Sequence, residues 1–574
     1  MIKSIQIENI KGIDNKKFEL NIFPNKPSLL VAPNGFGKSS FAIAFNSMNN
    51  SRIILDNDNF HLERDTNLPR ISIEYEKEDK TILNLEATNS TNKISRDIDY
   101  FVINNQIKPK GIGSQYGTAT ARLEIKDIKV RKIPDNVNFD YSNTNAKNKF
   151  GRNGKVLPNL NTIFSNLKLI EKLSENYAVL KKANGKIIQA RINAIISNIN
   201  TKNGTNDVLL EWINNNELNT LKQIEYLSFL GNLLNEFDTP LTETQNFLCA
   251  IQLIWLYNDD ENKFKKACLY SNYRLDKQKF DDTLKTFNCT WKNIKSSEHD
   301  GDLIVKFPKA TLISNGQRDI LTFISMLFNA KSHLNKTDNI LIIDEVFDYL
   351  DDANLIAAQY YITRFIDDFD KQGKRIYPLI LTHLNPNYFK NFAFKDQKVY
   401  YLDKSQMQVN NNLIKLLRKR TDPIIKEDVD KYLFHYNPQT INRRNVFRSL
   451  SLPEKWGEAN NFVEFLNIEV NKYINNQTYD PFAVCGAVRI KIEEIAYDKL
   501  QSTESKEEFI KTHTTRNKLE KAEEYGVVSP ESHYLLGIIY NEGMHWKENQ
   551  DNVSPIASKL ENLVIKKLIK DVFI

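Results

Sequence analysis

The chain has 574 residues, too many for one compact core, so we expect two to four domains. Apolar residues make up 41% and charged residues 26%, as in ordinary globular proteins, and the net charge of +6 tolerates nucleic acid without indicating it. The four cysteines form no C-x-x-C pair, which speaks against a disulfide framework or a zinc site and favours a reducing cytoplasm. No signal peptide is expected, and the longest apolar run, residues 247–257, is too short to span a bilayer.

The first part of the chain predicts strands followed by a helix. Residues 2–7 alternate polar and apolar side chains, and residues 18–22 are expected to pair with them. Residues 28–31 (SLLV) predict a short apolar strand, and residues 39–47 have helical character. Further strands are expected at residues 71–75, 82–86 and 100–103.

Helical periodicity dominates from about residue 160 to residue 295, without sustained heptads, so we expect a helical insertion rather than a long coiled coil. Strands alternating with helices then indicate an α/β sheet. After about residue 403 the chain again reads as mainly helical. The returning strands are expected at residues 303–307, 340–343 and 379–381, with helices starting near residues 316 and 352.

Residues 32–40 (APNGFGKSS) follow an apolar strand and open a helix, which is the context of a P-loop. The backbone N–H groups of such a loop wrap a β-phosphate at a helix N-terminus. Lys38 is expected to reach the β- and γ-phosphates, and Ser39 to hold Mg²⁺. Ala32 replaces the first glycine of the strict pattern, a mild departure. The expected ATP contacts are Asn34, Gly35, Phe36, Gly37, Lys38, Ser39 and Ser40.

Residues 339–345 (NILIIDE) predict a buried strand that ends in two carboxylates. On a parallel strand neighbouring the P-loop, Asp344 can hold Mg²⁺ and Glu345 can orient and deprotonate the attacking water. A plain core strand with a solvated acidic end is the alternative. The presence of the P-loop disfavours that alternative.

Four further segments refine this interpretation, although each is weak alone. Residues 314–318 (SNGQR) precede a helix and are similar to the ABC signature, with Asn315 in place of a glycine. Residues 348–351 (DYLD) resemble a D-loop, and His383, after the strand at 379–381, resembles a switch histidine. Gln106 resembles the Q-loop glutamine that contacts Mg²⁺.

In this order the six elements resemble the SMC-like branch of ABC ATPases, over about the first 115 residues and residues 295–403. SMC-like proteins split the ATPase head with an insertion between P-loop and signature. Here the insertion looks short and globular, as in anti-phage defence ATPases such as the Septu ATPase subunit, overcoming-lysogeny-defect nucleases and anticodon-nuclease ATPases. The resemblance implies an α/β fold: an ABC-type P-loop head split by a mostly helical insertion and followed by an all-helical C-terminal domain.

The expected domain boundaries follow from this comparison. They are 1–159 for the N-terminal lobe of the head, 160–295 for the insertion, 296–405 for the C-terminal lobe and 406–574 for the C-terminal domain. The resemblance further implies ATP and Mg²⁺ as cofactors and a homodimer or higher homo-oligomer. In that assembly Ser314, Gly316 and Gln317 of one copy face the γ-phosphate held by Lys38 of the other, in line with the anion affinity of helix N-termini. Asp344, Ser39 and Gln106 are the implied Mg²⁺ ligands, and Glu345 and His383 are the implied catalytic residues.

The C-terminal region offers a second candidate site. A Toprim nuclease is disfavoured, because the Asp-x-Asp at residues 428–430 lies in a helical stretch. Residues 482–494 and 534–545 resemble HEPN-type domains, and anticodon nucleases use Arg, Glu and His. Arg489, Glu493 and His545 are therefore candidates. The usual Arg before Asn-x-x-x-His is Tyr540 here, so a structural network in an interaction domain is the simpler expectation.

The resulting function is an ATPase regulator of a partner nuclease in cytoplasmic anti-phage defence. A self-contained toxin with a C-terminal RNase and an SMC-like DNA-repair ATPase remain alternatives, and ABC transport is the weakest because no membrane partner is indicated. Nucleic-acid contact stays open. Its candidate basic residues are Lys108, Lys110, Arg122, Arg131, Lys132, Arg418, Lys419, Arg420, Arg443 and Arg444.

Overall fold

The computed structural model describes the chain except for a set of short segments: residues 33–36, 78, 105–106, 113–119, 126, 238, 288–293, 308–313, 385, 387–388, 390–397, 402–406, 548–551 and 574. For residues 107–112, 120–125, 315 and 349 it describes the backbone alone. The chain forms two compact units. One comprises Met1–Asn105, Leu334–Tyr349 and Leu355–Ile574, and the other comprises Gln106–His333 and Leu350–Asn354.

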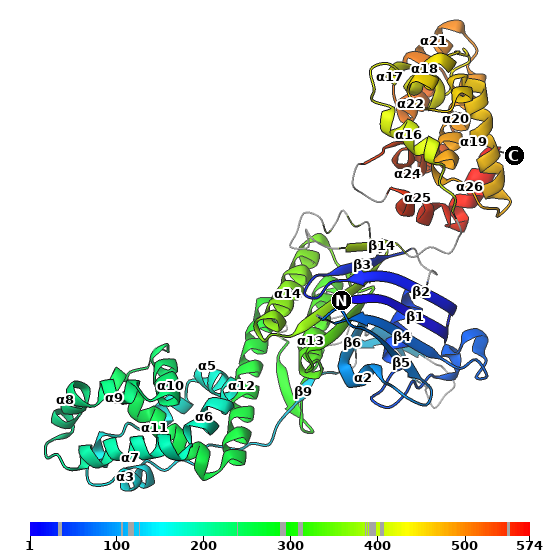
Figure 1. Cartoon of the computed structure of the whole chain (residues 1–574). Coiled ribbons are helices and arrows are strands. Elements are labelled where there is room, and N and C mark those ends of the chain that lie inside the picture. The colour runs from blue at the N-terminus through cyan, green and yellow to red at the C-terminus, as the bar shows by residue number, and fades with distance from the viewer. Residues whose placement is uncertain are drawn as a thin grey trace. The chain divides into compact units, whose positions relative to one another are not determined.

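A five-stranded parallel sheet lies in the first unit (Figure 1). Its strands, in spatial order, are β14 (Lys398–Tyr401), β3 (Ser28–Val31), β13 (Arg375–Thr382), β12 (Asp338–Asp344) and β6 (Ile98–Asn104). The inner strands are nearly continuous apolar runs, which is the pattern of parallel strands covered on both faces. Every residue of β3 is buried, and so is β12 up to its last residue.

The carboxyl ends of these strands share one edge of the sheet. Asp344 at the end of β12 is in register with Leu381 of β13 and Asn104 of β6, and Thr382 is in register with Val31 of β3. The expectation that the acidic strand neighbours the P-loop strand is wrong, because β13 lies between β12 and β3. Parallel strands are joined by long crossovers, so sequence order does not fix their spatial order. Both motifs still meet at the same edge.

A four-stranded antiparallel sheet and helix α1 (Lys38–Asn46) complete the core around the parallel sheet. The order is β2 (Ile13–Ile22), β1 (Ile2–Ile10), β4 (Arg70–Glu76) and β5 (Ile82–Thr88). The predicted pairing of the first two strands is confirmed, with Ile5 opposite Phe18. Phe41 of α1 contacts Phe18 edge to face, with ring centroids 5.3 Å apart, and belongs to one apolar cluster that spans both sheets. Helix α1 is thereby fixed beside β12, which positions its first turn. The short elements η1 (Asn57–Asn59), η2 (His61–Glu63), α2 (Ile94–Asp97) and η5 (Phe347–Tyr349) connect the strands. The 20-residue helix α14 (Asp352–Lys371) lies between β12 and β13 in the sequence.

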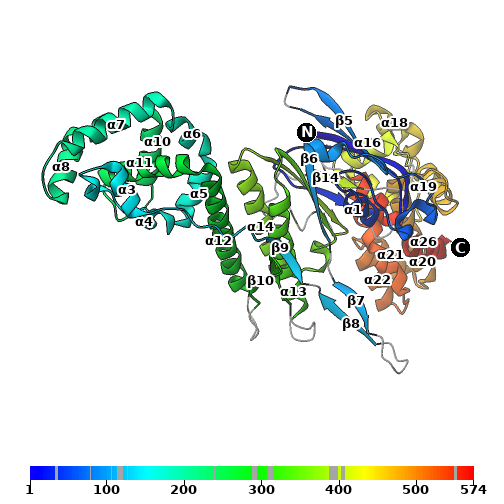
Figure 2. The same cartoon turned by 90° about the horizontal axis from the view of Figure 1, so that it is seen from below.

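The second unit is mostly helical. Its strands are β7 (Ile107–Ile112), β8 (Thr120–Ile125), β9 (Ile128–Lys132), β10 (Ser296–His299) and β11 (Asp302–Val305). Its helices are α3 (Asn143–Phe150), η3 (Gly154–Val156), α4 (Asn161–Phe164), α5 (Leu167–Glu175), α6 (Tyr177–Ala183), α7 (Lys186–Asn200), α8 (Asn206–Asn216), α9 (Leu218–Lys222), α10 (Glu225–Asn235), α11 (Glu243–Asp259), α12 (Glu261–Phe287) and α13 (Asn315–His333). Figure 2 shows the helices from α3 to α11 gathered at one end of the long helix α12, around a single apolar cluster.

Helices also form the part of the chain after β14. They are α16 (Asn411–Lys419), α17 (Lys426–Asp428), η6 (Val429–Leu433), α18 (Arg444–Ser449), η7 (Glu454–Gly457), α19 (Ala459–Ile474), α20 (Pro481–Lys499), α21 (Thr503–Lys511), α22 (Thr515–Glu524), α23 (Glu531–Leu535), α24 (Gly537–Tyr540), η8 (Glu542–Met544), α25 (Val553–Leu560) and α26 (Leu563–Phe573). Helix α20 is central to their apolar cluster. It begins at Pro481, after Asp480 caps its first backbone N–H groups. Among the described residues, no helix is long and apolar enough to cross a membrane.

Candidate functional site

Lys38 opens helix α1 with a side chain that is only 2% exposed. Gly37 before it has a φ of 92°, a left-handed conformation that glycine adopts without steric cost. The Lys38 Nζ donates to the backbone oxygen of Ala32 at 2.7 Å and lies 3.4 Å from Oε1 of Glu345. The end of the loop therefore carries a buried ammonium held between a carbonyl and a carboxylate.

Asp344 and Glu345 lie at the end of β12. The φ of Glu345 is 54°, a left-handed conformation that is uncommon for residues other than glycine and is often found at functional sites. Burial and the charge of Glu345 raise the pKa of Asp344 to about 7, while Lys38 opposes the shift. The Asp344 Oδ1 is buried and has no hydrogen-bond partner. A buried carboxylate oxygen in this state is suited to accept a cation.

Asp348 joins two residues at the end of β13. Its side chain is fully buried, and it accepts a hydrogen bond from the hydroxyl of Thr382. The Nδ1 of His383 lies 2.8 Å from Oδ2 of Asp348, and the backbone N–H of His383 donates to the same oxygen at 3.2 Å. These contacts fix the imidazole, which remains 41% exposed, with Nε2 directed away from Asp348. The residues predicted separately as a D-loop carboxylate and a switch histidine, Asp348 and His383, therefore form one hydrogen-bonded pair.

The N-terminus of α13 carries the signature-like segment. Ser314 is exposed, and its Oγ accepts from the backbone N–H of Gln317 at 3.3 Å. The side chain of Gln317 is buried, and its Nε2 donates to the backbone oxygen of Phe287 at 2.8 Å. The Ser314 hydroxyl thus lies at the start of the helix, whereas the side-chain amide of Gln317 is hydrogen-bonded to the backbone of Phe287.

Gly316 faces the start of α14. A Cβ at this position would lie 2.8 Å from Nδ2 of Asn354 and 3.0 Å from Oδ2 of Asp351. Asp351 in turn caps α14, because its Oδ1 accepts from the backbone N–H of Asn354 at 2.9 Å. A methyl group at this position would therefore require the ends of these two side chains to move.

The remaining predicted residues of the head are placed as follows. Ser39 is exposed in the first turn of α1, whereas Ser40 is buried and its Oγ accepts from the backbone N–H of Gly12 at 3.2 Å. The Ser40 hydroxyl is therefore already used in the fold. Asn34, Gly35, Phe36 and Gln106 lie outside the described residues.

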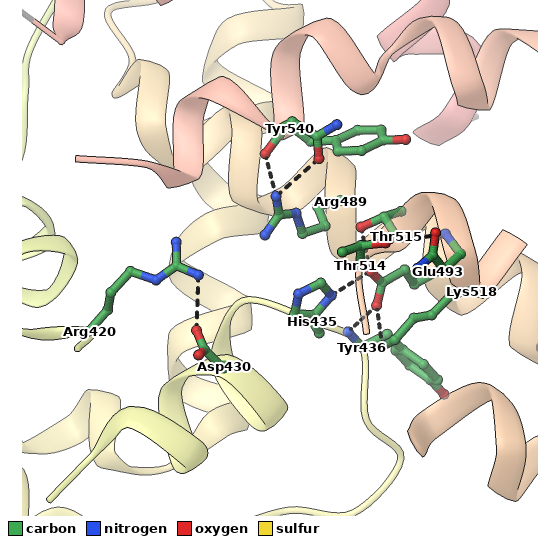
Figure 3. Close-up of polar contacts among 12 residues, drawn as sticks. Arg420, Asp430, His435, Tyr436, Arg489, Glu493, Thr514, Thr515, Lys518 and Tyr540 are labelled. Atoms are coloured by element: carbon green, nitrogen blue, oxygen red, sulfur yellow. Dashed lines mark hydrogen bonds and ion pairs between the residues drawn. The ribbon is translucent and has the colours of Figure 1, made fainter. Parts of the chain in front are cut away.

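Arg489 and Glu493 lie one turn apart on α20 but contact different partners (Figure 3). The Nη2 of Arg489 donates to the backbone oxygen of Tyr540 at 2.8 Å and lies 3.5 Å from Oδ1 of Asn541. His545 follows η8 with an exposed side chain. The structure thus places Arg489 in contact with the segment that precedes His545, whereas the carboxylate of Glu493 binds other residues.

The carboxylate of Glu493 is completely buried and accepts four hydrogen bonds. Oε1 accepts from Nδ1 of His435 and from the hydroxyl of Thr515, both at 2.6 Å. Oε2 accepts from the backbone N–H of Tyr436 at 3.0 Å and from Nζ of Lys518 at 2.8 Å. Burial alone raises the pKa of Glu493, but His435 and Lys518 outweigh it and lower the pKa to about 2. This is the arrangement of a structural network that ties α20 to α22 and to residues 435–436.

Several residues of the basic clusters are paired within the chain. The pairs are Arg131 with Asp276, Arg420 with Asp430, Arg443 with Asp428, and Arg444 with Glu458. The side chains of Lys108, Lys110 and Arg122 lie outside the described residues. Much of the charge that suggested a nucleic-acid surface is thus offset by neighbouring carboxylates.

Sequence reasoning does not find His435, because it lies 58 residues before Glu493 and no local pattern links the two. It also does not find the bond between Asp348 and His383, although both residues are predicted separately. A signal was available for the second pair, since both residues follow strands whose carboxyl ends share one edge of a parallel sheet.

No family model matches the sequence, and no curated protein matches it. Similar solved structures include an Smc head domain with an extended coiled coil bound to the C-terminal domain of ScpA, from Pyrococcus furiosus, at 12% identity and a TM-score of 0.26 over 68% of this chain and 91% of that one. Another is the recombination mediator protein RecF with ATP, at 14% identity and a TM-score of 0.24 over 66% and 93% of the two chains. TM-scores this low carry no argument about function, which therefore rests on the chain's own residues.

Proposed function

We propose that the chain is an ABC-type ATPase that binds MgATP at its P-loop and hydrolyses it between two copies of the chain. The observation that carries this proposal is the buried ammonium of Lys38, 3.4 Å from Glu345 and at the same sheet edge as Asp344. An ammonium, a candidate base and a candidate metal ligand are the groups that phosphoryl transfer to water requires.

The residues at this edge fit a nucleotide with its magnesium ion. Phosphate oxygens replace the contacts that Lys38 makes with Ala32 and Glu345. The unpartnered Oδ1 of Asp344 and the exposed Ser39 supply oxygen ligands of the kind that Mg²⁺ prefers. When bound, Mg²⁺ neutralises charge on the phosphates and favours the ionised form of Asp344.

Glu345 is the proposed general base. Its contact with Lys38 holds it at the P-loop before nucleotide arrives, and transfer of Lys38 to the phosphates frees its carboxylate to accept a proton from water. His383, held by Asp348, is proposed to contact the γ-phosphate through Nε2. The pair presents a ring whose orientation is set before the substrate binds.

The second half of the site is proposed to come from another copy of the chain. Ser314 directly precedes a 19-residue helix whose first turn holds Gly316 and Gln317, and the dipole at this end of a helix favours an anion. The amide of Gln317 contributes only if it leaves Phe287, so we assign the γ-phosphate contact to the Ser314 hydroxyl and the backbone around Gly316. ATP then joins two heads, and its hydrolysis separates them.

A regulatory role in anti-phage defence follows from the sequence resemblance alone. In this proposal the ATP-dependent change of assembly controls a partner nuclease through the C-terminal helices. A self-contained RNase built on Arg489, Glu493 and His545 is not favoured, because the fold already uses every acceptor position of the Glu493 carboxylate.

The deciding experiment measures binding of a fluorescent ATP analogue and release of phosphate by the purified chain with Mg²⁺. Lys38→Ala is expected to weaken nucleotide binding by about 10- to 100-fold, since charge-assisted phosphate contacts are lost. Lys285→Ala is the matched control, because Lys285 is an exposed helical lysine that pairs with Asp282. Absence of nucleotide binding in the wild-type chain, or equal binding in Lys38→Ala, contradicts the proposal.

A further inference from the structure

A buried guanidinium that bonds to no carboxylate of the described residues lies among the C-terminal helices. Arg489 is 4% exposed, and the hydrogen bonds of its Nη2 go to the neutral oxygens of Tyr540 and Asn541. Its Nε is buried and has no hydrogen-bond partner. Glu493, one turn away, is fully engaged with other donors. A buried charge without a counter-ion lowers the stability of the fold, so an anion bound beside Arg489 would be stabilising.

A second guanidinium faces the first. Figure 3 shows the side chains of Arg420 and Arg489 directed toward the same space, with Arg420 approaching from the side of Asp430. Arg420 donates to the backbone oxygen of Met544 and, through Nη2, to Oδ1 of Asp430 at 3.0 Å. Burial lowers the pKa of Arg489; Glu493 opposes this, and the charge of Arg420 lowers it further. The two like charges are therefore close enough to repel.

His545 directly follows Met544, whose backbone oxygen accepts a hydrogen bond from Arg420. Burial lowers its pKa, and the charges of Arg420 and Arg489 lower it further, as expected of a ring close to both guanidinium groups. The charge of Asp430 opposes these effects and raises the pKa of His545. In the cluster of Arg420, Arg489 and His545, Arg420 pairs with Asp430, whereas Arg489 donates to neutral oxygens, so Arg489 is the guanidinium that lacks a bonded carboxylate among the described residues.

The Glu493 network fixes the position of this cluster. Its four hydrogen bonds lock α20, and with it Arg489, against α22 and residues 435–436. The Nδ1 of His435 faces Glu493, so its other ring nitrogen points away from that carboxylate (Figure 3). Glu493 is accordingly a positioning residue: it holds Arg489 in place and is not itself part of the cluster.

We propose that Arg420, Arg489 and His545 form a binding site for a phosphate group, carried by a nucleotide or by a single strand of RNA. Guanidinium groups bind phosphate with paired N–H donors, and two of them that converge on one space suit its tetrahedral oxygens. The bound phosphate supplies the missing negative charge for Arg489. This site is separate from the P-loop and does not depend on ATP hydrolysis.

The test uses the full chain carrying Lys38→Ala, so that the P-loop does not contribute, and a short fluorescein-labelled oligouridylate followed by anisotropy. Arg420→Gln and Arg489→Gln are each expected to weaken binding at least about tenfold. Arg516→Gln is the matched control, because Arg516 lies in the same helical region, is 75% exposed and pairs with Glu520; its affinity stays within about twofold. If the melting temperature shows that Arg489→Gln does not fold, the Arg420→Gln variant alone decides the test, because Arg420 is 18% exposed.

Competition with AMP separates the two sources of phosphate. Displacement of the oligouridylate by AMP, with the same sensitivity to Arg420→Gln, assigns the site to a nucleotide. Binding that AMP does not displace assigns it to the RNA strand. Failure of both probes to bind, unchanged affinity in Arg420→Gln, or an equal loss in Arg516→Gln overturns the proposal. None of these results depends on whether Lys38 binds ATP.

Discussion

The Nζ of Lys38 lies 3.4 Å from Oε1 of Glu345, although β13 separates the strands that precede these two residues. The contact is possible because the carboxyl ends of β3 and β12 share one edge and Glu345 adopts a positive φ. In the proposed mechanism this ion pair is exchanged for a bond to phosphate when ATP binds. Nucleotide binding and release of the base are thereby coupled.

Glu345→Gln is expected to lower the rate of ATP hydrolysis by about 10²- to 10⁴-fold, because a neutral amide does not accept the proton of the attacking water. Nucleotide binding persists, since Lys38 remains. We therefore expect an ATP-bound dimer to accumulate, measurable by light scattering after size-exclusion chromatography. Glu454→Gln, at an exposed surface pair with Arg448, should behave like the wild type. Hydrolysis at the wild-type rate in Glu345→Gln would show that another group is the base.

Asp344→Asn is expected to stabilise the nucleotide-free chain while abolishing Mg²⁺-dependent hydrolysis. The folded-state pKa of Asp344 is raised from 3.8 to about 7, so ionising this residue costs folding free energy. The contribution of Asp344 to the free energy of unfolding of the wild type therefore falls progressively as the pH rises from about 4 to about 7. The difference in stability in favour of the variant grows over the same pH range. We expect a gain of about 1–3 kcal/mol at pH 8, measured by urea unfolding. A constant difference from pH 4 to pH 8 would contradict the assigned pKa.

Much of the part of the chain that forms the two sheets can be predicted from sequence, because its strands are distinct local patterns. The pairing of β1 with β2, the buried run of β12 and the helix after Gly37 all follow from periodicity or glycine content. The order of strands in the parallel sheet does not, since it is set by the packing of crossovers. The partners of Glu493 escape prediction for a related reason. A buried carboxylate needs hydrogen-bond donors, but the sequence contains many possible donors. Only the folded structure determines which of them meet at Glu493.

Asp348 and His383 are expected to act as one unit in hydrolysis. His383→Ala and Asp348→Ala should each lower the rate constant about tenfold or more, and the double variant should be little worse than either, because each single change already breaks the pair. Steady-state kinetics measures this double-mutant cycle. Thr363→Val is the control, since the Thr363 hydroxyl donates to the backbone oxygen of Gln359 within α14 and contacts neither member of the pair. If the losses in rate of the two single variants were additive in the double variant, the two residues would act independently.

Gly316→Ala is expected to weaken ATP-dependent dimerisation about tenfold and to leave ATP binding by the single head unchanged. The added methyl meets the ends of two flexible side chains, Asn354 and Asp351, so the fold itself can adjust. Analytical ultracentrifugation with and without ATP measures the effect. Gly316→Ala combined with Asn354→Ala removes the nearest atom. Recovery of dimerisation in that double variant would point to the local clash rather than to the phosphate contact.

Glu493→Gln is expected to destabilise the C-terminal helices by about 3–5 kcal/mol, because Lys518, 4% exposed, keeps its charge and loses its carboxylate partner. Hydrogen exchange measured by mass spectrometry on α20 and α22 localises the effect to these helices. The contribution has a defined pH window. The pKa of Glu493 is lowered from 4.5 to about 2, so its stabilisation is present above about pH 4.5 and is lost as the pH falls toward 2.

Glu520→Gln on α22 provides the comparison for that prediction. Glu520 is half exposed and pairs with Arg516 at the surface, where an ion pair is worth about 0–1 kcal/mol. The two variants remove the same charge, so a difference between them isolates burial as the cause. If exchange in α20 were equally slow in both, the four hydrogen bonds would not be what holds Arg489 in position. Arg489 would then have to be fixed by its bonds to Tyr540 and Asn541 alone.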